Sequence, residues 1–221
     1  MLKRATLATL SLAIVASMGV RAAETVSLAQ LVHKVPANAA EDYRASLRAL
    51  SAGDLEAAIL RFEHALRADG ENAAGHYDFG LLLLANGRTD EALAEFDRAS
   101  LLDAHLAASR LRASYALLKL EKFGEAEAAA RSALAISRGS IEAKLLLGWS
   151  LVQQRVYSEE ALRNLDQAAR EFPEARMAAA EALMHLGKLR EAGEQVERYL
   201  ATGDSSQKQL AESWRELLAI D

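Results

Sequence analysis

The sequence predicts an all-α solenoid of repeated helical hairpins, and two observations support that class. An alanine recurs five times along the 221 residues, in most copies with a bulky residue four positions later and a small residue three positions after that. The chain holds only two prolines and 5% aromatic residues, so it is poor in strand formers. A fixed period of this length is typical of units that bury their apolar faces by stacking on one another. The anchor alanines, at spacings of 34, 34, 35 and 31 residues, are Ala58, Ala92, Ala126, Ala161 and Ala192.

The N-terminal residues have the pattern of a secretory signal peptide. Lys3 and Arg4 precede an apolar run over 5–20, and Val20-Arg21-Ala22 has the small-x-small form of a cleavage site. An uncleaved membrane anchor is the alternative, but the run is shorter than the roughly 20 residues that a spanning helix needs. We expect cleavage of 1–22 and a periplasmic or secreted mature protein.

Charge and cysteine content limit the classes of partner. Loss of 1–22 removes three basic residues and no acid, which moves the net charge from −5 to −8. An acidic chain without a basic cluster argues against nucleic acid or anionic lipid as partner. The absence of cysteine suits an oxidising compartment and excludes a lipid anchor on an N-terminal cysteine, so we expect no stable membrane anchor after cleavage.

Each anchor alanine is expected in the second helix of a hairpin, with a first helix before it. Gly53, Gly87 and Gly187 are expected to end first helices in the left-handed conformation, and Asp54 and Thr89 to cap the helices that follow.

Upstream, residues 23–38 form a leader or a short helix that ends before Pro36. Asn38 and Glu41 have the spacing of a capping box that opens the first hairpin.

The hairpins resemble tetratricopeptide repeats. The resemblance rests on the anchor alanines and on small residues at one position of every first helix, where two helices cross closely: Ser46, Gly80, Ser114, Gly148 and Ala180. It implies a right-handed superhelical solenoid of about five repeats, at 39–72, 73–106, 107–140, 141–172 and 173–206.

A final helix is predicted within 207–221, with an apolar stripe at Leu210, Trp214, Leu217 and Leu218. Asp204 or Ser205 is expected to cap it. Tyr199 stands where the earlier units have alanine, so we expect this helix to pack there and to close the end of the solenoid.

The resemblance also implies that the first helices line the inner wall of the superhelix. Nine wall positions are nominated as a partner-binding groove: Tyr43, Leu47, Tyr77, Leu81, Leu111, Tyr115, Leu145, Trp149 and Met177. The last hairpin carries Glu181 at the position equivalent to Trp149.

An apolar wall of this kind is expected to bind a protein or peptide segment. Two alternatives stay open. The wall side chains pack within the chain, against adjacent repeats or residues 24–36, or the wall or the final helix forms a homodimer interface. The wall has few donors for a ligand carboxylate, with only Arg44 and Arg112 near suitable positions.

The sequence favours a non-enzymatic scaffold. It contains no nucleophile elbow and no phosphate-binding loop. Its five histidines are scattered without the i, i+4 pairing of a zinc-binding helix. We expect no catalytic residue, no metal site and no cofactor.

Overall fold

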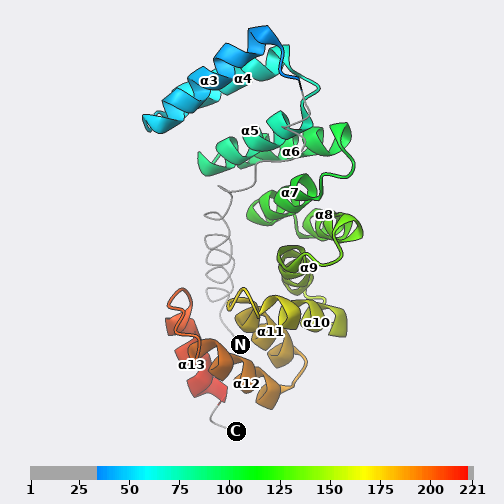
Figure 1. Ribbon diagram of the computed structural model, residues 1–221. Coiled ribbons are helices and arrows are strands. Elements are labelled where there is room, and N and C mark those ends of the chain that lie inside the picture. The colour runs from blue at the N-terminus through cyan, green and yellow to red at the C-terminus, as the bar shows by residue number, and fades with distance from the viewer. Residues whose placement is uncertain (1–33, 219–221) are drawn as a thin grey trace. The chain divides into compact units, whose positions relative to one another are not determined.

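The computed structural model describes residues 34–218, which form eleven helices and no strand (Figure 1). They divide into two compact units, the N-terminal unit (34–116) and the C-terminal unit (117–218), with the boundary inside α7. The expected signal peptide over 1–22 and most of the leader over 23–38 lie outside the described residues. The first five helices are α3 (Ala37–Ser51), α4 (Leu55–Ala68), α5 (Ala73–Ala85), α6 (Thr89–Leu102) and α7 (Ala107–Lys119). The others are α8 (Phe123–Ile136), α9 (Ile141–Gln153), α10 (Glu159–Ala168), α11 (Ala175–His185), α12 (Leu189–Leu200) and α13 (Lys208–Leu218).

In the N-terminal unit the helices pair as hairpins. α3 packs on α4, α5 packs on α6, and α4 contacts α5. Aromatic rings join the two hairpins: Phe62 of α4 stacks on Phe79 of α5, with 5.4 Å between ring centroids, and meets Tyr43 edge-on at 5.2 Å. The bulky motif residue Phe62 therefore joins its own hairpin to the next one.

In the C-terminal unit, α9 contacts three other helices, α8, α10 and α11. A polar link reinforces this stack. Arg131 of α8 donates to both carboxylate oxygens of Glu160 on α10, at 2.6 and 2.9 Å, and to Glu127 at 2.9 Å. The amide of Gln154, just after α9, donates to the other oxygen of Glu127 at 2.8 Å.

The small residues stand at close helix crossings, as the motif requires. The five anchor alanines are fully buried. A Cβ added at Gly80 would lie 2.6 Å from the ring of Phe96, and one at Gly148 would lie 2.7 Å from Leu165. Both distances are below van der Waals contact, so the first and second helices of these hairpins approach too closely for a larger residue.

The expected turn glycines adopt the left-handed conformation, with φ of 77° at Gly53, 79° at Gly87 and 72° at Gly187. In the two hairpins between them the same turn is made without glycine, by Glu121 (φ 58°) and Arg155 (φ 62°). These two hairpins therefore keep the left-handed turn although their sequence has no glycine at that position.

The helix starts follow the expected capping only in part. Asp54 accepts from the backbone N–H of Ala57 at 3.0 Å, as predicted. The prediction for Thr89 is wrong, because its hydroxyl bonds to the carbonyl of Gly87 and α6 has no side-chain cap. The capping box at Asn38 is also wrong: α3 begins at Ala37, two residues before the start that Asn38 would cap, and follows Pro36, whose fixed φ suits a helix start.

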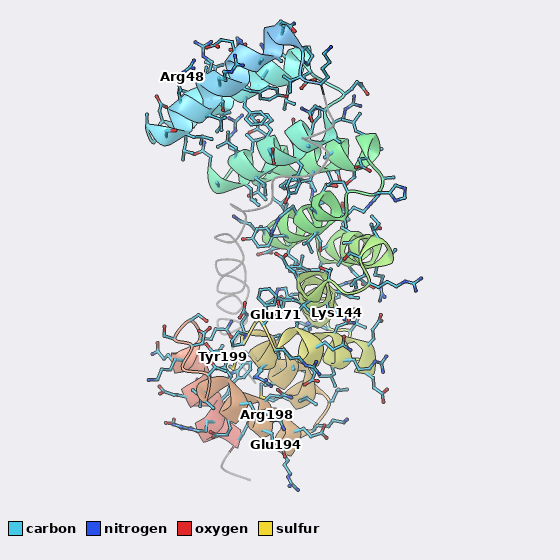
Figure 2. All side chains as sticks on the ribbon, in the orientation of Figure 1. Arg48, Lys144, Glu171, Glu194, Arg198 and Tyr199 are labelled. Atoms are coloured by element: carbon cyan, nitrogen blue, oxygen red, sulfur yellow. The ribbon has the colours of Figure 1, made fainter. Side chains whose placement is uncertain are left out.

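The last helix, α13, packs on α12 around Tyr199, which is fully buried (labelled in Figure 2). The Tyr199 hydroxyl donates to Asp204 at 3.0 Å and accepts from the backbone N–H of Gln207 at 2.8 Å. Asp204 thus holds the turn before α13 and does not cap the helix. The predicted stripe is partly wrong, because Trp214 is buried but Leu217 is 49% exposed.

Candidate functional site

The nine nominated residues lie on the first helices of successive hairpins, and we call them the first-helix face. α3 carries Tyr43 and Leu47, and α5, α7 and α9 each carry an equivalent pair spaced by four residues, which places both members on one side of their helix. Met177 is the single member on α11. The pairs after α3 are Tyr77 and Leu81, Leu111 and Tyr115, and Leu145 and Trp149.

In the N-terminal unit, part of this face is accessible. Leu47 is 62% exposed, although it is a large apolar side chain. Tyr43, Leu81 and Leu111 are half-buried, whereas Tyr77 and Tyr115 are buried. The accessible positions come from all three first helices of the unit, α3, α5 and α7.

Tyr43 is held in place by its hydroxyl. It donates to Asp69 at 3.1 Å, and the amide of Asn72 donates to the same carboxylate at 2.8 Å. Burial, and then the charge of Asp69, raise the pKa of the Tyr43 hydroxyl above its ordinary value. The hydroxyl is therefore already bonded, and what Tyr43 offers a ligand is ring surface.

In the C-terminal unit, the equivalent residues are buried. Trp149 is 1% exposed, and Leu145 and Met177 are fully buried. They belong to runs in which every residue is buried, Leu145 to Val152 on α9 and Met177 to Leu183 on α11. A helix buried on all sides takes part in the core through all its faces.

Glu181 on α11 is the exception in this apolar surrounding. Its side chain is 4% exposed, and its Oε2 atom has no hydrogen-bond partner. Burial raises the pKa of the Glu181 carboxyl to about 7. The sequence pattern predicts no role for Glu181, although an acid inside the apolar run MAAAEALM was an available signal.

Two aromatic rings lie next to Glu181. Tyr157, in the turn after α9, stacks on His185 of α11 with 4.4 Å between ring centroids. Burial, and then the charge of Glu181, raise the pKa of the Tyr157 hydroxyl. The carboxylate therefore lies at the junction of α11 with the turn that follows α9.

The other polar candidates have different surroundings. Arg44 is exposed and lies 3.8 Å from Glu41, and Arg112 is buried, so the two form no paired clamp for a ligand carboxylate. His76 bonds to Glu95 at 2.6 Å and to the carbonyl of Gly70 at 3.1 Å, which is a structural role. Within residues 34–218, no three His, Asp or Glu side chains are grouped to hold a metal.

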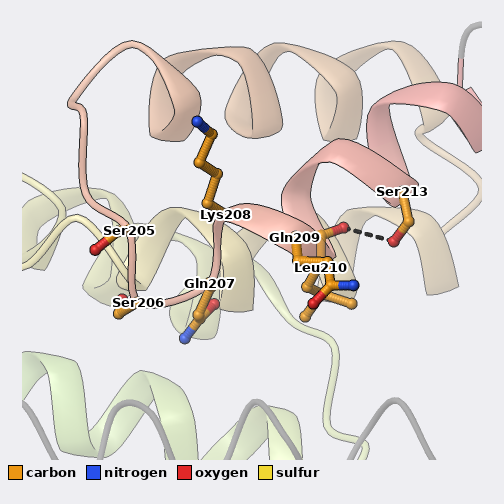
Figure 3. Close-up of a pocket in the computed structure, with 7 residues that line it drawn as sticks. All are labelled: Ser205, Ser206, Gln207, Lys208, Gln209, Leu210 and Ser213. Atoms are coloured by element: carbon orange, nitrogen blue, oxygen red, sulfur yellow. Dashed lines mark hydrogen bonds between the residues drawn. The ribbon is translucent and has the colours of Figure 1, made fainter.

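A pocket of about 480 Å³ lies beside the start of α13 (Figure 3). Polar side chains dominate its lining, with the hydroxyl of Ser213 donating to the carbonyl of Leu210 at 2.9 Å. It contains no member of the first-helix face. The lining residues are Ser205, Ser206, Gln207, Lys208, Gln209, Leu210 and Ser213.

Comparison with known proteins identifies the repeats. Two sequence profiles described as tetratricopeptide repeat match residues 49–115 and 145–207. These stretches run from the end of α3 through most of α7 and from within α9 through α12, and they include four of the five anchor alanines. The class defined by the fold is a helical-hairpin repeat scaffold, and the chain belongs to the tetratricopeptide repeat family. Proteins of this family generally mediate protein–protein interaction and are typically non-catalytic.

Solved structures agree on the fold at low sequence identity. MamA from Desulfovibrio magneticus RS-1 is 18% identical, with 76% of this chain and 96% of that chain covered and a TM-score of 0.69. YrrB, described as a protein with an unusual peptide-binding site, is 19% identical over 77% and 88%, with a TM-score of 0.66. The pilF protein of Pseudomonas aeruginosa is 15% identical over 83% and 89%, with a TM-score of 0.62. No protein of curated function matches the chain in sequence.

These likenesses confirm the predicted all-α solenoid fold. Within residues 34–218, no helix is long and apolar enough to cross a membrane.

Proposed function

We propose that this chain is a non-enzymatic scaffold of the bacterial cell envelope that binds a segment of a partner protein along the first-helix face. The signal-peptide pattern over 1–22 supports the compartment, and the family supports the kind of activity. The description of YrrB as peptide-binding adds an example from a chain of similar fold. The acidic charge and the absence of a basic cluster fit a protein partner better than a nucleic acid.

The observation that carries the proposal is the accessible apolar surface on α3, α5 and α7. Leu47 is 62% exposed, and Tyr43, Leu81 and Leu111 show part of their surface at equivalent positions of neighbouring hairpins. Scattered exposed leucines are ordinary, but apolar residues repeated in register on one face are typical of an interaction surface. An extended or helical segment laid across successive first helices would contact them in turn.

The test is a charge placed at Leu47, with a matched control in the same hairpin. Leu60 is also a leucine with a similar exposure of 53%, but it lies on the second helix, α4. We expect L47E to lose the partner captured by the wild-type mature protein from a periplasmic extract, and L60E to retain it. Circular dichroism melts should match for all three proteins. Equal capture by L47E and wild type would contradict the proposal.

Leu47 is chosen because burial makes other wall residues unsuitable. Alanine at Trp149 or Tyr115 would remove core side chains, so loss of binding there would not separate recognition from folding.

The second candidate is a self-associating module. On α13, Leu217 is 49% exposed, and a homodimer through this helix or through the first-helix face would cover apolar surface. Light scattering of the mature protein decides between them. A stable dimer that L47E or L217E converts to monomer favours the second candidate, whereas a monomer that binds its partner through Leu47 favours the first.

The compartment has a separate test. A C-terminally tagged chain should be released by osmotic shock, and its N-terminal sequence should begin at residue 23. An intact chain in the cytoplasmic fraction would contradict the proposed location in the cell envelope. It would leave the proposed binding of a partner segment standing.

A further inference from the structure

The first helix of the last hairpin carries an ionisable residue, Glu181, that the proposed function does not use. Glu181 lies at the position of α11 that Trp149 has on α9, four residues after Met177 and three before Met184. This spacing places the two methionines and the carboxylate on the same side of α11.

Within residues 34–218, the buried Glu181 carboxyl has no partner of opposite charge. Glu181 forms no ion pair with a described lysine or arginine, and its Oε2 atom, with the side chain 96% buried, has no hydrogen-bond partner. Buried charges in folded proteins are normally paired, because removing a carboxylate from water without compensation is costly. A counterion that arrives from outside would remove that cost.

We propose that Glu181 recognises a lysine or arginine side chain of a partner protein segment that binds along α9 and α11 of the C-terminal unit. The inference rests on the proposed function and adds the chemistry of the partner: a basic side chain flanked by apolar residues. A neutral donor such as a backbone N–H would leave the net charge buried, whereas a cation cancels it.

The surroundings of Glu181 suit a long cationic side chain. Lysine and arginine carry an apolar stem, which can lie along apolar and aromatic surface while the charged head reaches the carboxylate. Tyr157 supplies such surface, because it is half-buried in the turn after α9 and close to Glu181: burial, and then the charge of Glu181, raise the pKa of its hydroxyl.

Access to the carboxylate requires local movement, and the residues beside it allow it. Met177 is buried and Met184 is half-buried. Methionine is unbranched and readily changes rotamer, which makes it common at surfaces that rearrange to bind. Rotamer changes at these two positions are the local movement that the proposal requires.

The experiment selects ligands without assuming the natural partner. A library of random 12-residue peptides is displayed on phage and selected on the mature wild-type protein, on E181Q and on E171Q. Glu171 is an exposed acid of the same unit (labelled in Figure 2), so E171Q makes the same charge change at a site without burial. Wild type and E171Q should enrich lysine or arginine at one position between apolar residues, and E181Q should not.

A selected peptide then provides the quantitative test. Replacing its basic residue by norleucine should weaken binding to wild type and E171Q by at least about tenfold, and to E181Q by less than about threefold. E181D should keep the preference for a basic residue, because it keeps the charge.

The outcomes separate this inference from the proposed function. Selected peptides that lack a basic residue in common would overturn the role of Glu181 and leave standing the proposed function, which L47E tests separately in the N-terminal unit. An equal effect of norleucine on wild type and E181Q would do the same. Failure to select any peptide on the wild-type protein would count against both.

Discussion

The first helix of the first hairpin and the first helix of the fourth hairpin have equivalent positions in the repeat but opposite surroundings. In α3 only Ala39 and Ser46 are buried, whereas α9 buries every residue from Leu145 to Val152. Composition contributes: α3 carries charged residues around its circumference, and α9 reads LLLGWSLV.

Packing contributes more to the difference. Among the described helices, α3 has its principal contact with α4 alone, while α9 contacts α8, α10 and α11. A wall position therefore faces solvent or core according to what stacks beside it. Leu47 and Trp149 occupy the same register and differ for this reason.

The strongest test of this comparison is a pair of alanine substitutions at that shared position. W149A should lower the free energy of unfolding by about 3–5 kcal/mol, because it leaves a cavity in a packed core. L47A should change it by less than about 0.5 kcal/mol, because the side chain is mostly in water. Urea denaturation followed by circular dichroism measures both. Similar losses for the two variants would mean that the register, and not the surroundings, sets the role of the position.

A pH series sharpens the comparison at Glu181. Burial raises the pKa of this carboxyl in the folded protein to about 7, from 4.5 without burial, so the folded state holds its proton over a range in which the unfolded state has lost it. The contribution of Glu181 to the free energy of unfolding is therefore fully present below about pH 4.5. It falls by up to about 3 kcal/mol as the pH rises to about 7.

E181Q should remove that part of the pH dependence, and the exposed control E171Q should retain it. Denaturation midpoints at pH 4.5 and 7.5 for the three proteins give the measurement. If the difference between the midpoints at pH 4.5 and 7.5 persists in E181Q, the pH dependence comes from other groups.

The smallest expected effects come from two helical glycines of the C-terminal unit. G148A should destabilise by about 1–3 kcal/mol, because the new Cβ would lie 2.7 Å from Leu165. G193A should stabilise by about 0.5–1 kcal/mol, since nothing lies within 4 Å of its Cβ position on α12 and alanine favours helix. Thermal melts compare them directly. Effects of the same sign would show that the crowding at the α9–α10 crossing is not what selects glycine there.

Much of the fold was predictable from the sequence because each repeat contains residues that mark its helix register. The anchor alanines, the small residues at Gly80 and Gly148, and the turns at Gly53, Gly87 and Gly187 are local requirements of close packing and left-handed backbone. The missed features lack such a local signal. Glu121 and Arg155 adopt positive φ because the neighbouring helices demand the turn, and Pro36 replaces the expected capping box.

The candidate site was predictable only as a set of positions. The nine residues of the first-helix face could be aligned from the repeat, but their exposure ranges from that of Leu47 to that of the fully buried Leu145 and Met177. The unpaired state of Glu181 was not predictable either, since an isolated acid in a helix is most often solvated.

The sequence by itself determined the class of this protein: a period near 34 with small residues at fixed positions allows only stacked helical hairpins. The tertiary structure decided which of the aligned residues meet solvent, which form the core, and that one carboxylate lies among them without a counterion. The reason is that register is a local property of one hairpin, whereas burial depends on all the helices that stack against it.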